Sequence, residues 1–319
     1  MKSRVLGRTG LECSEVALGT WAFNSVVYGP VAVGEAHMTV RRALDEGITL
    51  FDTAPLYGTR KCDGIAEEVL GQALGADRER VLISTKFGRR ATQGNRADFN
   101  AANVSASVDE SLARLSTDRV DVLFFHSPFG ADEIDDDVWE ALARVRERGK
   151  VRAVGHSISK FTDTQNMARR WAEESRIDVI QVVYSLLNRE ATVFIGDLAA
   201  QGVGVVARES LANGFLSGAV SRDTVFPEGS LNARYSRDEV AARVDQVQRL
   251  SFLVRDPVAS VPQAAMRWVL DNPGISSVLT GARSAAEVAD CAEAAGLPGY
   301  SAAELARAQD AHGQDFPAA

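Results

Sequence analysis

Short apolar runs rich in β-branched residues recur along this chain, and segments with helical periodicity separate them. Eight such runs occur, at residues 16–18, 48–51, 81–85, 122–125, 151–154, 179–183, 203–206 and 275–279. Two stripes at helical spacing between them are Val104, Val108, Leu112 and Leu115, and then Val138, Leu142 and Val145. Strands that are apolar throughout and alternate with helices indicate a parallel sheet covered by helices.

Eight strand–helix units favour a closed (β/α)₈ TIM barrel over an open doubly wound sheet, which usually has fewer strands. Before the first unit, residues 4–13 are typical of a short β-hairpin with its turn at 8–10. No low-complexity or linker-like tract interrupts the chain, so we expect one domain over residues 1–319.

Helix starts and long loops add detail to this barrel. Ser260 followed by Pro262 predicts a helix with proline at its first position. Residues 284–287 and 301–304 both read Ser-Ala-Ala-Glu, the pattern of a capping box. The longest segments without a clear strand, at 20–35, 87–100 and 208–257, all follow strand C-termini, and active sites of barrels form at that end.

Composition narrows the class of protein. The 319 residues are 45% hydrophobic and 24% charged, and the net charge of −8 with a pI near 5.2 argues against a nucleic-acid surface. No apolar run is long enough to span a membrane, and residues 1–8 lack a leader pattern. Cys13, Cys62 and Cys291 form neither a disulfide framework nor a zinc pattern, so we expect a cytoplasmic protein.

Four polar residues at or just after strand ends carry the candidate chemistry: Asp52, Tyr57, Lys86 and His126. A Lys86 ammonium is expected to lower the pKa of Tyr57, with Asp52 as the counter-charge that keeps the buried lysine protonated. His126 would orient a carbonyl oxygen to which Tyr57 delivers a proton. Such a relay suits carbonyl reduction, for which a cofactor must bring the hydride.

Each of the four also has a purely structural interpretation. A strand-end Asp is often a helix N-cap, and a loop Tyr often packs at a rim. A Lys after a strand is usually solvated, and a strand-end His is usually a satisfied core residue. Four complementary types at one end of a barrel nevertheless favour a proton-handling site.

The chain resembles the aldo-keto reductases over nearly its whole length. The matching segments are Leu6-Gly7-Arg8-Thr9-Gly10-Leu11, Gly19-Thr20-Trp21, Phe51-Asp52-Thr53-Ala54, Tyr57-Gly58, Glu67-Glu68-Val69-Leu70-Gly71, Ser84-Thr85-Lys86, His126-Ser127-Pro128, Gln181, Tyr184, residues 211–218 and Thr280-Gly281-Ala282-Arg283. The resemblance implies a (β/α)₈ barrel and an NAD(P)-dependent alcohol or sugar dehydrogenase that interconverts a carbonyl and an alcohol. It also implies Asp52, Tyr57, Lys86 and His126 as the catalytic tetrad, with Tyr57 as general acid/base.

The same resemblance implies a cofactor site at the C-terminal mouth of the barrel. Ser157 and Gln181 are expected to hold the carboxamide, and Arg208 to lie near the nicotinamide ring. Arg283 is expected at the adenosine end, where the following helix N-terminus favours anions. The other cofactor residues implied are Gly19, Thr20, Trp21, Leu211, Gly214, Leu216, Ser217, Gly218, Gly281 and Glu287, with 214–218 around the pyrophosphate.

Some positions depart from the family pattern. Ile158 stands where Asn is frequent, and Ser210 stands where Pro is usual. Glu287 and Cys291 occupy positions that often carry Arg or Gln and Asn around the adenosine phosphate, and a carboxylate there would repel a 2′-phosphate. Glu287 is also a capping-box residue, so NAD(H) stays open, while Arg283 and the habit of the family favour NADP(H) slightly over NAD(H).

The expected substrate pocket has aromatic walls from separate loops, formed by Trp21, Tyr28, Phe87 and Phe129. Such walls suit a small aldehyde, ketone or sugar as the partner molecule. Arg89, with Arg90 beside it, is interpreted either as a contact for an anionic substrate group or as a solvated loop residue. The sequence does not specify an oligomeric state.

Two other functions fit the residues less well. A metal-dependent barrel hydrolase would use His126, His156 and Asp52, but no His-x-His pair stands at a strand end, so no metal site is expected. A non-catalytic regulatory subunit that binds nicotinamide, as channel-associated relatives do, is disfavoured by the complete tetrad.

Overall fold

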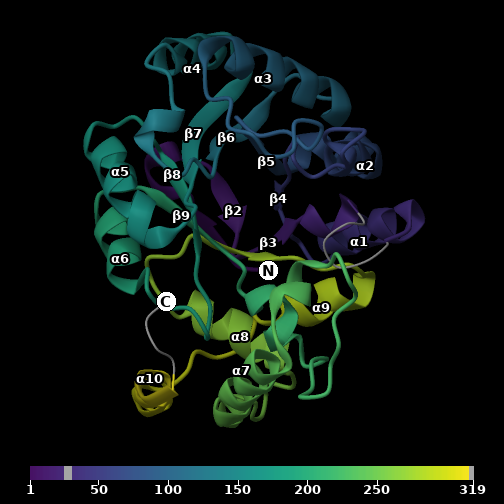
Figure 1. Cartoon of the computed structure of the whole chain (residues 1–319), viewed down its shortest axis with the longest axis vertical. Helices are drawn as coiled ribbons and strands as arrows, with labels where there is room; N and C mark the ends of the chain where they lie inside the picture. Colours follow the sequence, from purple (N-terminus) through teal and green to yellow (C-terminus); the bar gives the residue numbers. More distant parts are fainter. Residues whose placement is uncertain (25–30, 316–319) are drawn as a thin grey trace.

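Eight parallel strands close into a barrel at the centre of the computed structural model, which describes residues 1–24 and 31–315 (Figure 1). In chain order they are β3 (Val16–Gly19), β4 (Leu50–Asp52), β5 (Leu82–Phe87), β6 (Val120–His126), β7 (Val151–Ser157), β8 (Val179–Val183), β9 (Gly204–Arg208) and β10 (Ser277–Thr280). Strand β10 closes the barrel by pairing in parallel with β3. The predicted (β/α)₈ barrel is confirmed, and each of the eight apolar runs supplies one strand.

Helices cover the outside of the barrel (Figure 1). They are α1 (Val33–Asp45), α2 (Ile65–Leu74), α3 (Ala101–Leu115), α4 (Val138–Glu147), α5 (Phe161–Glu173), α6 (Thr192–Ala200), α8 (Val261–Leu270) and α9 (Ala285–Glu293). Two further helices, α7 (Arg237–Arg249) and α10 (Ala302–Asp315), contact each other beyond α8. Within residues 1–24 and 31–315, no helix combines the length and the apolar character needed to cross a bilayer.

Alternation along the strands creates two apolar cores. Inward-facing residues fill the barrel interior: Leu50, Leu82, Val122, Phe124, Ala153, Val179, Val206 and Leu279. Outward-facing neighbours such as Phe51 and Phe125 join the larger core beneath the helices. Gly155 lies inside, where a Cβ would stand 2.4 Å from the Phe124 ring, so the ring can be accommodated only because this residue has no side chain.

A two-stranded hairpin, the element predicted for residues 4–13, seals the N-terminal end of the barrel. Strands β1 (Ser3–Val5) and β2 (Glu12–Ser14) pair antiparallel around a 3₁₀ turn. Leu6 and Leu11 are buried among the inward-facing barrel residues. A Cβ on Gly7 would lie 2.2 Å from the backbone nitrogen of Gly204 at the start of β9, so this turn must carry glycine to reach the barrel floor.

The N-terminal caps of α8 and α9 agree only in part with the caps predicted from the sequence. Ser260 is the N-cap of α8, but Pro262 is the second helical residue and not the first, because the helix begins at Val261. Ser284 caps α9 by accepting from the amide of Glu287, whereas the Glu287 carboxylate accepts from the amide of Arg283 at 2.8 Å. The reciprocal half of the predicted capping box at Ser284 is therefore wrong.

The capping box predicted at the start of α10 is formed in both directions. The Ser301 amide donates to the Glu304 carboxylate at 2.7 Å, and the Glu304 amide donates back to the Ser301 hydroxyl at 3.3 Å. The Glu304 carboxylate also pairs with Arg255 at 2.6 Å. This last pair ties α10 to the segment that precedes α8.

The longest connection runs from β9 to α8 over residues 209–260. It contains α7 and two 3₁₀ turns, η5 (Ala212–Ser217) and η6 (Leu231–Arg234). Because it leaves from the C-terminal end of β9, it lies at the end of the barrel where the candidate site is expected.

Candidate active site

Six consecutive strands each carry an inward-facing polar residue at or within two residues of their C-terminal end. These are Asp52 on β4, Lys86 on β5, His126 on β6, Ser157 on β7, Gln181 on β8 and Arg208 on β9. Since the strands are parallel and in adjacent register, these inward positions near their C-terminal ends meet at one mouth of the barrel. The predicted polar residues that lie on strands are thus brought together by strand alternation and register.

The Lys86 ammonium is the centre of this group. Its Nζ lies 2.6 Å from Oδ2 of Asp52, 3.0 Å from the Thr53 carbonyl and 3.0 Å from the Tyr57 hydroxyl. Lys86 and Asp52 are almost fully buried, with 1% and 2% of their surface exposed. A buried ion pair of this kind is stable only when its donors and acceptors are satisfied, as they are here.

Asp52 is held from several sides. Its Oδ1 accepts from the Ser84 hydroxyl at 2.7 Å and from Nε2 of Gln181 at 2.9 Å. The amide and hydroxyl of Thr20 both donate to its backbone carbonyl, at 2.9 and 3.1 Å. These bonds fix the carboxylate so that it faces Lys86.

Tyr57 reaches this site from the loop after β4. Its amide donates to the Ala54 carbonyl at 3.0 Å, which turns the chain back over the mouth. The ring lies edge-on to His126, with centroids 5.8 Å apart and planes at 84°, and 6.2 Å from the Trp21 ring. The hydroxyl therefore lies between the ammonium below and the open mouth above.

The protonation states of the pair follow from burial and charge. Burial on its own would lower the pKa of Lys86, but Asp52 and Tyr57 outweigh it and raise that pKa, so the lysine is charged. Burial raises the pKa of Tyr57 above its ordinary value, and Lys86 opposes this rise without reversing it. The expected net lowering of the Tyr57 pKa is therefore wrong, because desolvation exceeds the effect of the ammonium; the hydroxyl holds its proton at neutral pH.

His126 is neutral for the same kind of reason. Burial, together with the cations Lys86 and Arg208, lowers its pKa well below the ordinary value. Its Nδ1 has no hydrogen-bond partner among the described residues. A neutral imidazole facing the mouth carries one N–H that can donate to a ligand oxygen.

A cavity of about 800 Å³ extends from this group across the barrel mouth toward α9. The predicted cofactor residues that line it are Gly19, Trp21, Gln181, Arg208, Leu211, Gly214, Ser217, Gly281, Arg283 and Glu287. Asp290 and Cys291 line its far end.

Four predicted cofactor residues do not line this cavity. Thr20 is buried against Asp52, and Leu216 is buried in the apolar core beneath the helices. Ser157 is buried, with its hydroxyl 3.3 Å from that of Ser127. Gly218 ends the turn η5 in a left-handed conformation, with φ of 78°, which glycine adopts without strain, so this residue shapes the turn and does not line the cavity.

Most of the cavity-lining residues that the sequence did not predict lie within residues 219–232. We call this segment the strap; it lines one side of the cavity. Val225 and Phe226 belong to it, and Val225 is 74% exposed. The strap has neither strand nor helix periodicity. Its only sequence signal is its position after the seventh strand.

The cavity has the properties of a dinucleotide site. The buried Oγ of Ser210, Nε of Arg208 and Oδ1 of Asn213 lack partners in the part of the chain that the structure describes. A Cβ built on Gly214 or Gly281 meets nothing within 4 Å, so the backbone there is open to a ligand. Unfilled donors and acceptors beside open glycine backbone fit a long polar molecule such as a nicotinamide dinucleotide.

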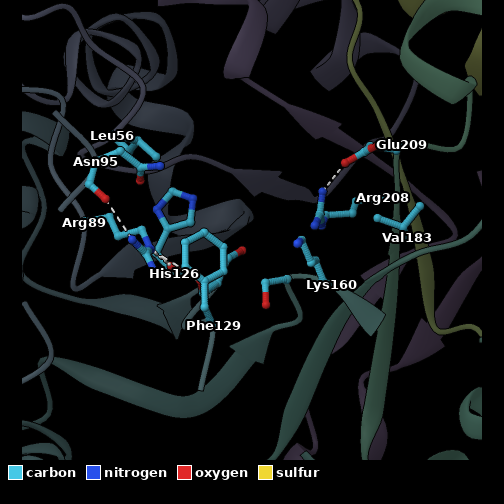
Figure 2. Close-up of a pocket in the computed structure, with 11 residues that line it drawn as sticks. Leu56, Arg89, Asn95, His126, Phe129, Lys160, Val183, Arg208 and Glu209 are labelled. Carbon is cyan, nitrogen blue, oxygen red and sulfur yellow. Dashed lines mark hydrogen bonds and ion pairs between the residues drawn. The ribbon is translucent and has the colours of Figure 1, made fainter. Parts of the chain in front are cut away.

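A second pocket of about 350 Å³ adjoins His126 (Figure 2). It is lined by Leu56, Arg89, Asn95, His126, Ser127, Phe129, Ser159, Lys160, Val183, Arg208 and Glu209. Of the aromatic walls predicted for a substrate, Phe129 lines this pocket, Trp21 lines the larger cavity and Tyr28 lies outside the described residues.

The prediction of Phe87 as a pocket wall is wrong. Phe87 is fully buried and packs against Phe99 and Phe125, with ring centroids 5.8 and 4.7 Å away. It directly follows the inward-facing Lys86, so strand alternation turns it outward, toward the helices.

Arg89 is neither solvated nor free. Its guanidinium donates to the carbonyl oxygens of His126 at 3.0 Å and Asn95 at 2.7 Å. It also pairs with Glu133 at 2.7 Å. Arg89 thus ties the loops after β5 and β6 together, and its charge is balanced within the protein; Arg90 likewise pairs with Glu110.

The residues of the metal-hydrolase alternative do not share one face. In the register of β6 and β7, His126 is opposite Ser157 and Phe125 is opposite His156. His156 therefore faces outward, where its ring lies 4.9 Å from that of Trp171. Among residues 1–24 and 31–315, no group of three or more His, Cys, Asp and Glu side chains is arranged to hold a metal ion.

A comparison with protein families, curated proteins and solved structures finds oxidoreductase relatives along nearly the whole chain. A family model described as "Aldo/keto reductase family" matches residues 15–311. Aldo-keto reductase YhdN of Bacillus subtilis is 30% identical, with 93% of this chain and 89% of that protein covered. L-galactose dehydrogenase of Arabidopsis thaliana is 32% identical, with 89% of this chain and 85% of that protein covered. Among solved structures, glycerol dehydrogenase AKR11B4 from Gluconobacter oxydans has a TM-score of 0.80 at 26% identity, covering 99% of this chain and 96% of that one.

Proposed function

This chain belongs to the aldo/keto reductase family, and from that premise we propose that it interconverts the carbonyl of a small aldehyde, ketone or sugar with the corresponding alcohol, using NAD(P)(H). One observation carries the catalytic assignment. The Tyr57 hydroxyl, still protonated, lies 3.0 Å from an ammonium that is itself 2.6 Å from a carboxylate. This arrangement can give up a proton and stabilise the phenolate left behind.

The four residues have separate roles in reduction. Tyr57 donates its proton to the carbonyl oxygen as negative charge develops there, and Lys86 stabilises the resulting phenolate. Asp52 keeps Lys86 charged, and neutral His126 donates a hydrogen bond that orients the same oxygen. A nicotinamide cofactor held by the residues of the larger cavity would supply the hydride for reduction and take it up in oxidation.

Residues of the larger cavity would hold the cofactor. Gln181 on β8 and Arg208 at the end of β9 line the cavity together with Tyr57 and suit the nicotinamide end. The open backbone at Gly214 and Gly281 suits the pyrophosphate, and Arg283, at the N-terminus of α9, suits the adenosine end.

The contact between Arg283 and Glu287 supports NAD(H) over NADP(H), against the slight preference drawn from the sequence. Nη2 of Arg283 donates to Oε1 of Glu287 at 2.8 Å, so the arginine charge is balanced before any cofactor binds. A 2′-phosphate at this end of the cavity would then meet a carboxylate. The proposed cofactor is NAD(H).

Replacing Glu287 by Gln tests this preference. The affinity for NADPH is expected to rise about fivefold, since a charge contact at a half-exposed site is worth about 1 kcal/mol, while the affinity for NADH stays within about twofold. Titration of cofactor fluorescence measures both constants. Equal changes for the two cofactors would show that Glu287 does not discriminate between them.

The function itself is tested with a generic aldehyde. Purified protein with NADH or NADPH is expected to reduce 4-nitrobenzaldehyde, followed by the loss of cofactor absorbance, with glyceraldehyde as a hydroxylated substrate of the kind that the names of the two dehydrogenase relatives suggest. Cofactor binding without turnover of either aldehyde would instead support the weaker alternative, a regulatory subunit that binds nicotinamide.

A further inference from the structure

The smaller pocket beside His126 is lined by three cationic side chains and one carboxylate. The cations are Arg89, Lys160 and Arg208, and the carboxylate is Glu209. Figure 2 shows His126 and Arg89 together on one side of the pocket, and Lys160 and Arg208 together on the other. Which of these charges remains unbalanced decides what the pocket attracts.

The two arginines are neutralised within the protein. Arg89 pairs with Glu133 at 2.7 Å, just outside the pocket. Arg208 pairs with the neighbouring Glu209, whose second oxygen accepts from the Asn213 amide at 3.1 Å. Both carboxylates are therefore engaged by an arginine, and neither compensates a further cation.

Lys160 has no such partner. Lys160 is exposed at the pocket, and in the part of the chain that the structure describes its ammonium forms no ion pair with a carboxylate within 4.0 Å. The nearest acid in sequence on the same helix, Asp163, accepts from the Thr162 hydroxyl at 3.2 Å instead. With His126 neutral, and with Arg89 balanced by Glu133 and Arg208 by Glu209, the one charge of the pocket lining that no ion pair balances is that of Lys160.

The position of Lys160 in the fold adds to this field. It is the N-cap residue of α5 and makes no side-chain capping bond. A cation is disfavoured at a helix N-terminus, because the helix dipole already places positive potential there. An anion at this point would be stabilised by the ammonium and by the helix together.

From this charge balance we infer that the enzyme is selective for carbonyl substrates that carry a carboxylate or phosphate, with the anionic group paired to Lys160. The inference rests on the proposed function, because the carbonyl is taken to lie at Tyr57 and His126. Leu56, Phe129 and Val183 supply apolar surface between the two ends. A pocket of about 350 Å³ accommodates a small molecule of this kind.

The test compares an anionic aldehyde with a neutral one of the same shape. The probes are 4-carboxybenzaldehyde and its methyl ester, in the unaltered protein and in Lys160→Gln. We expect kcat/KM for the carboxylate to fall about fivefold in Lys160→Gln, and that for the ester to stay within about twofold. Added salt is expected to weaken the preference of the unaltered protein only.

A matched control removes one positive charge elsewhere. Lys150 pairs with Asp109 at the start of β7, at the opposite end of the barrel. Lys150→Gln is expected to leave the ratio of the two kcat/KM values unchanged. Equal losses for both aldehydes in Lys160→Gln, or the same ratio as in Lys150→Gln, would overturn the inference.

Binding of unreactive analogues keeps the inference separate from the proposed function. If neither aldehyde is reduced, the proposed function fails, and tryptophan fluorescence still reports the affinities for 4-methylbenzoate and its methyl ester. A higher affinity for 4-methylbenzoate than for its methyl ester supports the anion site if this difference disappears in Lys160→Gln. No difference between the two analogues in the unaltered protein rejects it.

Discussion

Each residue of the proposed proton relay keeps one protonation state because of the groups packed against it. Lys86 stays charged, since Asp52 and Tyr57 more than offset the cost of its burial. His126 stays neutral, since burial and nearby cations lower its pKa. Tyr57 stays protonated, since burial raises its pKa. The site is thus set for donation to a carbonyl, and phenolate forms only when a proton acceptor arrives.

A flat pH profile for reduction follows from these states. A raised Tyr57 pKa keeps the donor loaded to higher pH, and a lowered His126 pKa keeps the imidazole neutral to lower pH. We expect kcat/KM for a neutral aldehyde to be nearly constant from about pH 6 to about pH 9. Oxidation of the alcohol, which needs ionised Tyr57, is expected to rise with pH over the same range. A reduction limb centred near pH 6.5 would show that His126 titrates.

The variant Tyr57→Phe isolates the proton donor. Turnover is expected to fall about a thousandfold, the usual worth of a positioned general acid. The affinity for the cofactor is expected to stay within about twofold, because the hydroxyl is bonded to Lys86 and its proposed role is to donate a proton to the substrate, not to hold the nucleotide. Steady-state rates and a cofactor fluorescence titration check the two expectations. A large loss of cofactor binding would mean that Tyr57 holds the nucleotide.

At the level of strands and loops, the sequence predicts those elements whose apolar residues recur at a regular period. The eight apolar runs predict the eight strands, and Asp52, Lys86 and His126 are the polar residues that follow three of these runs. Phe87, expected as a pocket wall on a loop, is the last residue of β5, and the twofold alternation of the strand turns it away from the mouth. The strap within residues 219–232 has no period, so its position beside the cavity depends on tertiary contacts that no local pattern records.

The packing of β6 against β7 gives a prediction at this scale. Gly155→Ala would place a methyl group 2.4 Å from the Phe124 ring and 2.9 Å from the Val179 carbonyl. We expect the free energy of unfolding to fall by about 1–3 kcal/mol, as for other overpacked cores. Urea unfolding measures the change.

A second glycine serves as the control for that substitution. Gly196 lies within α6, where an added Cβ meets nothing within 4 Å. Gly196→Ala is expected to stabilise the protein by up to about 1 kcal/mol through helix propensity. Unchanged stability in Gly155→Ala would show that Phe124 moves aside without cost.

Over the whole molecule, a buried histidine outside the site links stability to pH. His156 is fully buried against Trp171, both ring nitrogens lack partners among the described residues, and burial lowers its pKa to about 3. The histidine pKa in the unfolded chain is near 6.5. Between about pH 3 and pH 6.5, His156 is therefore protonated in the unfolded state and neutral in the folded state. Stability must therefore fall as the pH drops below about 6.5.

His156→Leu tests this link. Between pH 7 and pH 5 the unaltered protein is expected to lose about 2 kcal/mol more stability than the variant, by the proton linkage of one such group. Urea unfolding at the two pH values gives the comparison, and His126 contributes equally to both proteins. Parallel losses in the two would show that His156 is already protonated when folded, or is exposed to water.

The hairpin that closes the N-terminal end of the barrel has a consequence for the reprotonation of Tyr57. Leu6 and Leu11 fill the end opposite the mouth, and Lys86 and Asp52 are buried above them. In the proposed reduction Tyr57 gives up one hydrogen ion, and its side chain lines the cavity at the mouth, on the side that reactants would use. We therefore expect Tyr57 to regain its proton from solvent at the mouth once the alcohol has left, so that product release precedes the next proton donation.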